Sequence, residues 1–117
     1  MEIGTDIESI SRIEAVIKRT PRFVERCFTK NEIAYCENKG KGRFESYAAR
    51  FCAKEAFSKA IGKPLNWHDV EIINNEDNKP QIFTYNKANE LLNKRQIKLS
   101  LSHANDMAIA FVVIGHL

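Results

Sequence analysis

The chain has 117 residues, 44% of them hydrophobic and 28% charged, which is typical of one folded domain rather than of a disordered or multidomain protein. Its formal net charge of +3, from 18 Lys and Arg against 15 Asp and Glu, is too small to identify a nucleic-acid-binding protein. No apolar run approaches the length of a membrane span, and no signal-peptide pattern follows Met1, so we expect a cytoplasmic protein with a single domain, residues 1–117.

The chain begins with a predicted strand, residues 2–8. Because side chains alternate along a strand, Asp6 and Glu8 project from one face near its end, while the isoleucines lie on the other face. Two carboxylates on one face are candidate ligands of a cation. The same alternation also fits a half-exposed edge strand that has no site.

Three helical segments follow the strand. A helix begins at Ser9 or Ser11 and ends at Arg19, a helical turn covers residues 22–28, and a capping box at Thr29 begins a third helix. Basic side chains crowd this part of the chain and predict a surface for an anionic partner, with a plain solvated face as the alternative. They are Arg12, Lys18, Arg19, Arg22, Arg26 and Lys30.

A second basic patch lies in the loop of residues 38–42, where two glycines alternate with lysines. Such a backbone can fold around an anion, while Lys41 and the following Arg43 supply positive charge. No strand precedes the loop, so it is not a P-loop. Two basic patches indicate two anionic partners, or one anionic partner and a small molecule that carries phosphate.

The longest predicted helix, residues 43–62, looks buried on both faces and places a carboxylate among its apolar residues. Phe44 and Phe51 fall on one helical stripe, and Glu55 lies on the same stripe. A buried charge is costly without a partner or a metal ion. Either Glu55 pairs with Lys59, one turn further along a partly wet helix edge, or it belongs to a functional site.

The rest of the chain alternates between extended and helical patterns. We expect strands at residues 70–73, 81–85, 97–102 and 107–114, a helix at 86–95, and turns at 74–80 and 103–106. The last strand is almost continuously apolar, which is typical of a strand buried on both faces. The predicted fold is therefore a single α+β domain with the order β-α-α-α-β-β-α-β-β, in which an antiparallel sheet packs on the long buried helix.

The chemistry of these acids favours a magnesium ion. Asp6, Glu8 and Glu55 offer the hard oxygen ligands that Mg²⁺ takes together with water and substrate phosphates, and Lys54 and Lys59 could offset phosphate charge. The three cysteines have neither the spacing of a zinc site nor that of a disulfide framework. His103, at a strand–turn junction, could contact a phosphate or act as an acid or base, or it could be an exposed histidine without a role.

At these positions the sequence resembles a known family. The motifs are GTDI at residues 4–7 with Arg12-Ile13, Phe28-Thr29 with Glu32, RFCAKEA at 50–56 with Lys59-Ala60 and Gly62, and SLSH at 100–103. In this order and spacing they resemble the small bacterial holo-acyl-carrier-protein synthases, which are 4′-phosphopantetheinyl transferases, over nearly the whole chain. The resemblance implies transfer of the phosphopantetheine arm of coenzyme A to a serine of apo acyl carrier protein, with release of adenosine 3′,5′-bisphosphate, in support of fatty acid biosynthesis.

The resemblance also implies roles for the acids. Asp6 and Glu55 would hold a Mg²⁺ that bridges the coenzyme A pyrophosphate, and Lys59 would stabilise the departing bisphosphate. Ser9 stands where small members of the family usually have a carboxylate, whereas Glu8 lies on the same face as Asp6, so we propose Glu8 as a third metal ligand. The base that takes the proton of the carrier-protein serine is either a metal-bound water or a carboxylate of the site.

Coenzyme A contacts follow from the same likeness. Ser102 and His103 resemble a pair at the 3′-phosphate of the nucleotide, with Lys41 and Arg43 beside it. The turn before Pro80 resembles one that covers the adenine. The family's glycine is replaced there by Asn78, which still tolerates a left-handed backbone. The helix motif adds Arg50, Phe51, Lys54 and Lys59 to the expected contacts.

The resemblance finally implies two protein partners. Arg12, Arg19, Arg22 and Arg26 lie where family members present a positive face to the acidic acyl carrier protein. A homotrimer with active sites between subunits is also implied. Two other classes of function stay open: a module that binds nucleic acid through its basic patches, although few aromatic residues accompany them, and a different Mg²⁺-dependent phosphoryl-transfer or nucleotide-hydrolysing enzyme.

Overall fold

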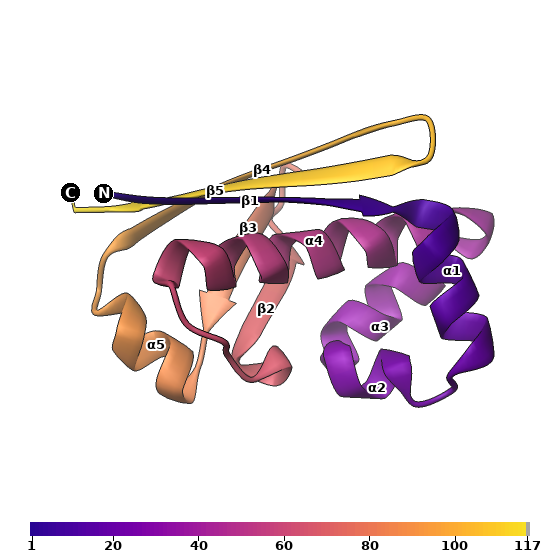
Figure 1. Cartoon of the computed structure of the whole chain (residues 1–117), viewed down its shortest axis with the longest axis horizontal. Coiled ribbons are helices and arrows are strands. Elements are labelled where there is room, and N and C mark those ends of the chain that lie inside the picture. The colour runs from indigo at the N-terminus through magenta and orange to yellow at the C-terminus, as the bar shows by residue number, and fades with distance from the viewer. Residues whose placement is uncertain (117) are drawn as a thin grey trace.

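The longest helix, α4 (Arg43–Ile61), runs along most of the molecule beneath a sheet (Figure 1). The structure, a computed structural model, describes residues 1–116. The other elements are β1 (Glu2–Ser9), α1 (Ile10–Arg19), α2 (Phe23–Cys27), α3 (Lys30–Glu37), β2 (Val70–Asn74), β3 (Pro80–Thr84), α5 (Asn86–Leu92), β4 (Gln96–Ala104) and β5 (Met107–Gly115), with 3₁₀ turns at Gly40–Gly42 and Trp67–Asp69. Within residues 1–116, no helix is both long and apolar enough to cross a bilayer. The predicted α+β fold is confirmed, and the element order differs by one helix, because the expected helical turn at residues 22–28 contains the helix α2.

The strands form two antiparallel sheets rather than the single sheet that we expected. One sheet has the order β1-β5-β4, so that β5 is its central strand, and β2 pairs only with β3. In the larger sheet Asp6 is opposite Ala110, and Ala110 is opposite Leu101. The acid-bearing strand β1 therefore lies at one edge of the sheet and β4 at the other.

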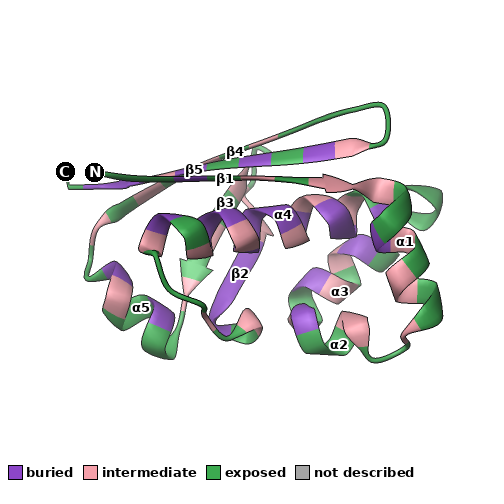
Figure 2. Cartoon of the chain, viewed as in Figure 1, coloured by how far each residue is buried: buried purple, intermediate pink, exposed green. Residues whose placement is uncertain are grey.

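The predicted burial of β5 on both faces is wrong. Ala108, Ala110 and Val112 face α4 and are fully buried, but Ile109 and Phe111 are 40% and 45% exposed. Figure 2 shows the resulting alternation of buried and exposed residues along the strand. An apolar run cannot show which face a single chain leaves uncovered. The outward face of the sheet is therefore apolar and open.

Local signals place most helix ends correctly. The predicted capping box at Thr29 is confirmed, with Glu32 as its partner, and α4 ends at Gly62 in the left-handed conformation (φ 83°). The N-cap of α1 is Ser9 rather than Ser11, because the Ser9 side chain accepts a hydrogen bond from the Arg12 backbone. The three cysteines are free and buried.

Small residues bring β1 and α4 into backbone contact. Gly4 is buried against α4, and a Cβ atom there would overlap the carbonyl oxygen of Ala56 and lie 2.8 Å from the backbone nitrogen of Ala60. A side chain at this position has no space unless the strand and the helix separate. This contact fixes the strand that bears Asp6 on the helix that bears Glu55.

We predict that Gly4→Ala destabilises the protein by at least about 3 kcal/mol, because the added methyl group meets backbone atoms that cannot rotate away. Denaturant unfolding followed by circular dichroism measures the loss. Gly42→Ala is the matched control, because nothing lies closer than 3.9 Å to a Cβ there. Equal stability of Gly4→Ala and the wild type would contradict the close packing.

Candidate functional site

The end of β1 and the middle of α4 bring three carboxylates together. Asp6 is almost buried, with a side chain 9% exposed, and its Oδ1 lies 3.1 Å from Nζ of Lys59. The same ammonium group donates to the backbone oxygen of Thr5 at 3.1 Å. Lys59 therefore pairs with Asp6 rather than with Glu55, which argues against the alternative of a simple Glu55–Lys59 pair.

In the acid cluster (Asp6, Glu8 and Glu55), the pKa values of Glu8 and Glu55 are raised. The pKa of Glu55 is raised by burial and by the charge of Asp6, while Lys59 opposes the shift. The pKa of Glu8 is raised to about 7 by burial, a hydrogen bond with Asp6 and the Asp6 charge; Arg12 opposes this shift, and Glu55 adds to it. One lysine does not balance three neighbouring acids, so the acid cluster favours an added cation.

The acid cluster suits a magnesium ion that shares its coordination with a substrate. Within the described part of the chain, no group of three or more His, Cys, Asp or Glu side chains could hold a metal ion. Magnesium does not require such a group, since it usually binds one or two carboxylates and completes its shell with water and phosphate oxygens. Asp6 and Glu55 fit that requirement, whereas Glu8 as a third ligand stays a prediction.

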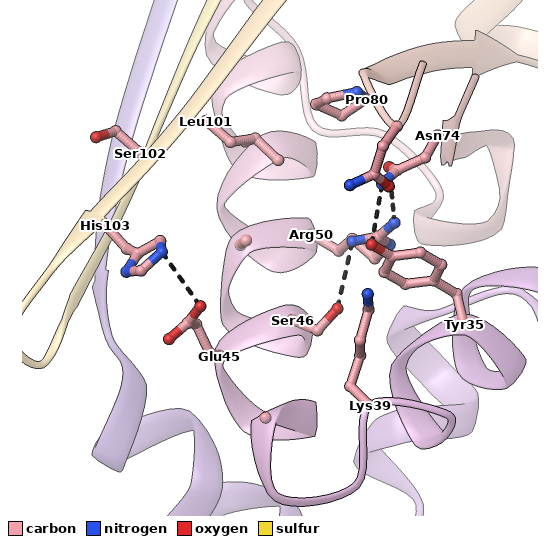
Figure 3. A pocket seen from close by; sticks show the side chains of 13 residues that line it. Tyr35, Lys39, Glu45, Ser46, Arg50, Asn74, Pro80, Leu101, Ser102 and His103 are labelled. Atoms are coloured by element: carbon pink, nitrogen blue, oxygen red, sulfur yellow. Dashed lines mark hydrogen bonds and ion pairs between the residues drawn. The ribbon is translucent and has the colours of Figure 1, made fainter. Parts of the chain in front are cut away.

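A pocket of about 530 Å³ opens on the other flank of α4. Its walls come from α3 and the turn that follows it, from the first half of α4, from the β2–β3 hairpin and from β4 (Figure 3). Five of the residues predicted to bind coenzyme A line it together: Arg50, Asn78, Pro80, Ser102 and His103. Sequence motifs far apart in the chain thus meet in one hollow of nucleotide size.

Arg50 is the most unusual residue of the pocket, because it is a buried cation without an acidic partner. The residue is 4% exposed, its Nη2 donates to Oδ1 of Asn74 at 3.1 Å, and its Nε has no hydrogen-bond partner. Among residues 1–116, no carboxylate lies within ion-pair distance of it. A buried charge of this kind calls for an anion from outside the chain.

His103 lies in β4 rather than in the expected turn, and Ser102 precedes it in the same strand, so their side chains face opposite sides of the sheet. His103 Nε2 is 3.3 Å from Oε1 of Glu45. Ser102 is opposite the outward-facing Ile109 in the register, and Figure 3 shows its side chain directed away from Arg50. The side chains of these neighbours therefore project from opposite faces of β4, although both residues line the pocket.

The structure corrects the expectation that Lys54 contacts a phosphate. Lys54 is buried, with Nζ 2.7 Å from Oε1 of Glu32, and it donates to the backbone oxygens of Cys27 and Trp67 at 2.8 and 2.9 Å. Its charge is therefore satisfied inside the protein, where Glu32 comes from the capping box of α3. Spacing along one helix could not reveal this partner.

Three other expected coenzyme A contacts lie outside the pocket of a single chain. Phe51 stacks on Trp67 at a centroid distance of 4.9 Å. The guanidinium group of Arg43 donates to the backbone oxygen of Gly40 and lies over the ring of Phe44, and Lys41 is exposed in the neighbouring 3₁₀ turn. Their assignment to coenzyme A stays a prediction.

The four arginines predicted to bind a partner are all exposed on or beside α1 and α2: Arg12, Arg19, Arg22 and Arg26. None of them has a carboxylate within ion-pair distance among the described residues. Arg12 lies close enough to Glu8 to lower its pKa. These four arginines, called the arginine surface below, therefore adjoin the acid cluster.

Sequence reasoning missed several residues of the pocket. Tyr35, Glu45, Ser46 and Asn74 line it but carried no motif, whereas Lys39 belongs to the basic loop that the sequence indicated. Helical spacing was the available signal, because Tyr35 and Lys39, and likewise Ser46 and Arg50, are four residues apart. Nothing in the sequence indicated that the β2–β3 hairpin lies against these helices.

The acid cluster and the pocket are separated within one chain. Asp6 and Leu101 lie on opposite edges of the sheet, about 10 Å apart by strand spacing, with Ala110 between them. Ala108 and Ala110 are fully buried, as is Cys52 of α4 beneath them. Close packing therefore blocks the direct path between the two features.

Known proteins resemble this chain over nearly its full length. The family model of the 4′-phosphopantetheinyl transferase superfamily matches residues 2–112. The chain is 44% identical over 119 residues to a holo-[acyl-carrier-protein] synthase of Chloroherpeton thalassium, covering 97% of each protein. It is 48% identical over 118 residues to the enzyme of that name from Clostridium beijerinckii, covering 96% of this chain and 94% of the relative.

Solved structures agree with the sequence relatives. A holo-(acyl-carrier-protein) synthase from Bacillus anthracis in complex with CoA (3′,5′-ADP) superposes with a TM-score of 0.84 at 34% identity, covering 99% of this chain and 96% of that one. The Helicobacter pylori holo-[acyl-carrier-protein] synthase in complex with coenzyme A gives 0.85 at 35% identity, with 97% and 99% covered.

The crowded acids predict a pH-dependent cost to stability. The pKa of Glu8 is raised from 4.5 to about 7 in the folded chain, so the folded state loses stability as the pH rises through this interval. Glu8→Gln should therefore stabilise the metal-free protein at pH 8 by about 1 kcal/mol, less than the full shift because solvent screens a partly exposed carboxylate.

The gain should disappear below about pH 3.5, where the carboxyl group is protonated in both the folded and the unfolded state. Denaturant unfolding with a chelator present measures it, and Glu76→Gln, in the exposed hairpin turn, is the control. A Glu8→Gln variant that is less stable than the wild type at pH 8 would show that the carboxylate is not strained.

Proposed function

The chain belongs to the 4′-phosphopantetheinyl transferase superfamily, and we propose that it is a magnesium-dependent holo-[acyl-carrier-protein] synthase. In the proposed reaction the serine oxygen of apo acyl carrier protein forms a bond to the β-phosphorus of coenzyme A. The bond from that phosphorus to the bridging oxygen breaks, and adenosine 3′,5′-bisphosphate leaves. The serine proton passes to a carboxylate of the acid cluster or to water.

The observation that best supports this proposed function is the presence of two sites in one chain: an acid cluster that suits a metal ion, and a pocket that contains a buried arginine without an acidic partner.

The two anionic groups of coenzyme A, its pyrophosphate and its 3′-phosphate, match the acid cluster and the pocket respectively. Asp6 and Glu55 would hold Mg²⁺, which neutralises pyrophosphate charge when bound. Lys59 is 55% exposed at its side chain while anchored to Asp6, so its ammonium group can contact the leaving phosphate. With the pyrophosphate bound there, the remaining anion of coenzyme A is the 3′-phosphate, and Arg50 and His103 of the pocket suit it.

We further propose that two copies of the chain complete each site. Buried packing separates the acid cluster of one chain from its own pocket, whereas a neighbouring copy can bring its pocket to the acid cluster. The outward sheet face, with Ile3, Ile7, Ile109 and Phe111 at 40% to 64% exposure, is an apolar surface on which copies can pack. A homotrimer is the assembly that the family resemblance implies.

The arginine surface beside the acid cluster suits an acidic carrier protein. Four exposed guanidinium groups without acidic partners attract a negatively charged helical protein and orient its serine toward the cluster. Such a substrate places the proposed reaction in fatty acid biosynthesis, in the cytoplasm.

We predict that Asp6→Asn and Glu55→Gln each lower transfer about a hundredfold or more, because each removes charge that would hold the metal against the pyrophosphate. Mass spectrometry of the carrier protein after incubation with coenzyme A and Mg²⁺ detects the added arm, and a chelator should stop it. Glu90→Gln, exposed on α5, should keep full activity. Undiminished transfer by Glu55→Gln would refute the metal assignment.

Charge reversal on the arginine surface should act on capture of the carrier protein. Arg19→Glu should raise KM for the carrier protein about tenfold and leave KM for coenzyme A unchanged, since the two substrates contact different surfaces. Added salt should weaken the wild-type reaction in the same direction. Lys87→Glu, an equivalent reversal on α5, is the control, and an equal effect of the two reversals would contradict a dedicated surface.

A further inference from the structure

Tyr35 occupies an unusual place in the wall of the pocket, because two cations lie over its ring. The guanidinium carbon of Arg50 is 3.9 Å from the ring centroid, and Nζ of Lys39 is 4.7 Å from it. Both side chains line the same pocket (Figure 3). Two like charges held near one another repel, and the electron-rich face of an aromatic ring offsets part of that cost.

The hydroxyl group of Tyr35 adds a polar link to the same arginine. Asn74 donates to Tyr35 Oη at 2.9 Å, while Oδ1 of Asn74 accepts from Nη2 of Arg50 at 3.1 Å. The other contact of the guanidinium group, from Nη1 to Oγ of Ser46, is long at 3.4 Å. The ring of Tyr35 and the amide of Asn74 therefore determine where this buried charge points.

We propose that Tyr35 is a positioning residue that makes the pocket selective for a nucleotide bearing a 3′-phosphate. The inference rests on the proposed function, in which the pyrophosphate of coenzyme A binds at the acid cluster and its 3′-phosphate enters the pocket. Tyr35 acts through Arg50 and Lys39: it holds both cations on one wall before the ligand arrives. The ligand phosphate then meets a preorganised pair of charges and supplies the anion that Arg50 lacks within the chain.

This role differs from general support of the fold. A residue that only stabilises the pocket would affect every nucleotide alike, whereas Tyr35 should affect only ligands that carry the 3′-phosphate. The matched pair of substrates is coenzyme A and its 3′-dephospho form. The matched pair of binding probes is adenosine 3′,5′-bisphosphate and adenosine 5′-monophosphate.

The experiment measures binding of both probes by titration calorimetry to the intact protein and its variants. The wild type should bind the bisphosphate about tenfold or more tightly than the monophosphate. Tyr35→Leu, which removes the ring, should reduce this preference about tenfold, and Tyr35→Phe, which removes only the hydroxyl group, about threefold. Monophosphate affinity should stay unchanged in both variants. Tyr85→Leu, which removes a half-exposed tyrosine ring outside this pocket, should keep the full preference.

Steady-state kinetics provides the second readout. Tyr35→Leu should raise KM for coenzyme A about tenfold with kcat retained, and leave KM for dephospho-coenzyme A unchanged. An equal rise in KM for both substrates, or an unchanged preference between the two probes, would overturn the proposal even if the enzyme is active. Tyr35→Phe serves the same purpose should Tyr35→Leu not fold. A wild-type chain that binds neither probe would refute both this inference and the proposed function.

Discussion

The direct contact between β1 and α4 is the constraint on which the rest of the structure depends. Gly4 has no space for a side chain above Ala56 and Ala60, and the inward face of β5 is lined near α4 by alanines. Small residues let the backbone of the strand approach the helix closely. Asp6 therefore reaches Lys59 and Glu55, residues that are distant in sequence. The same packing fills the space beneath β5, which keeps the acid cluster apart from the pocket.

Two opposite charge imbalances result from this arrangement, and both have a chemical use. The acid cluster contains three carboxylates against one lysine, and the pKa values of Glu8 and Glu55 are raised there, while Arg50 is buried without an acidic partner. Each arrangement costs stability in the free protein. A ligand that carries a metal-bound pyrophosphate and a separate phosphate would relieve both costs. Coenzyme A has this distribution of charge.

The sequence alone predicted most of the fold and the acidic part of the site. Alternation along residues 2–8 placed Asp6 and Glu8 on one face, and helical spacing marked Glu55 as a carboxylate in a buried stripe. These are local patterns with fixed periods. Periodicity could not show that Lys54 meets Glu32 across two helices, that Arg50 lies over Tyr35, or that one face of β5 is left open. Each of these depends on how separate elements pack.

The central claim is that the acid cluster of one chain works with the pocket of another, and mixing two inactive variants tests it directly. Glu55→Gln disables the acid cluster, and Ala49→Trp fills the pocket, which Ala49 lines. After the two proteins are unfolded together and refolded at equal amounts, a quarter of the shared sites should be intact, so transfer should recover to about a quarter of the wild-type rate. Recovery of that size would support the claim. Mixed assemblies that stay inactive, although mass spectrometry shows that they contain both variants, would contradict it.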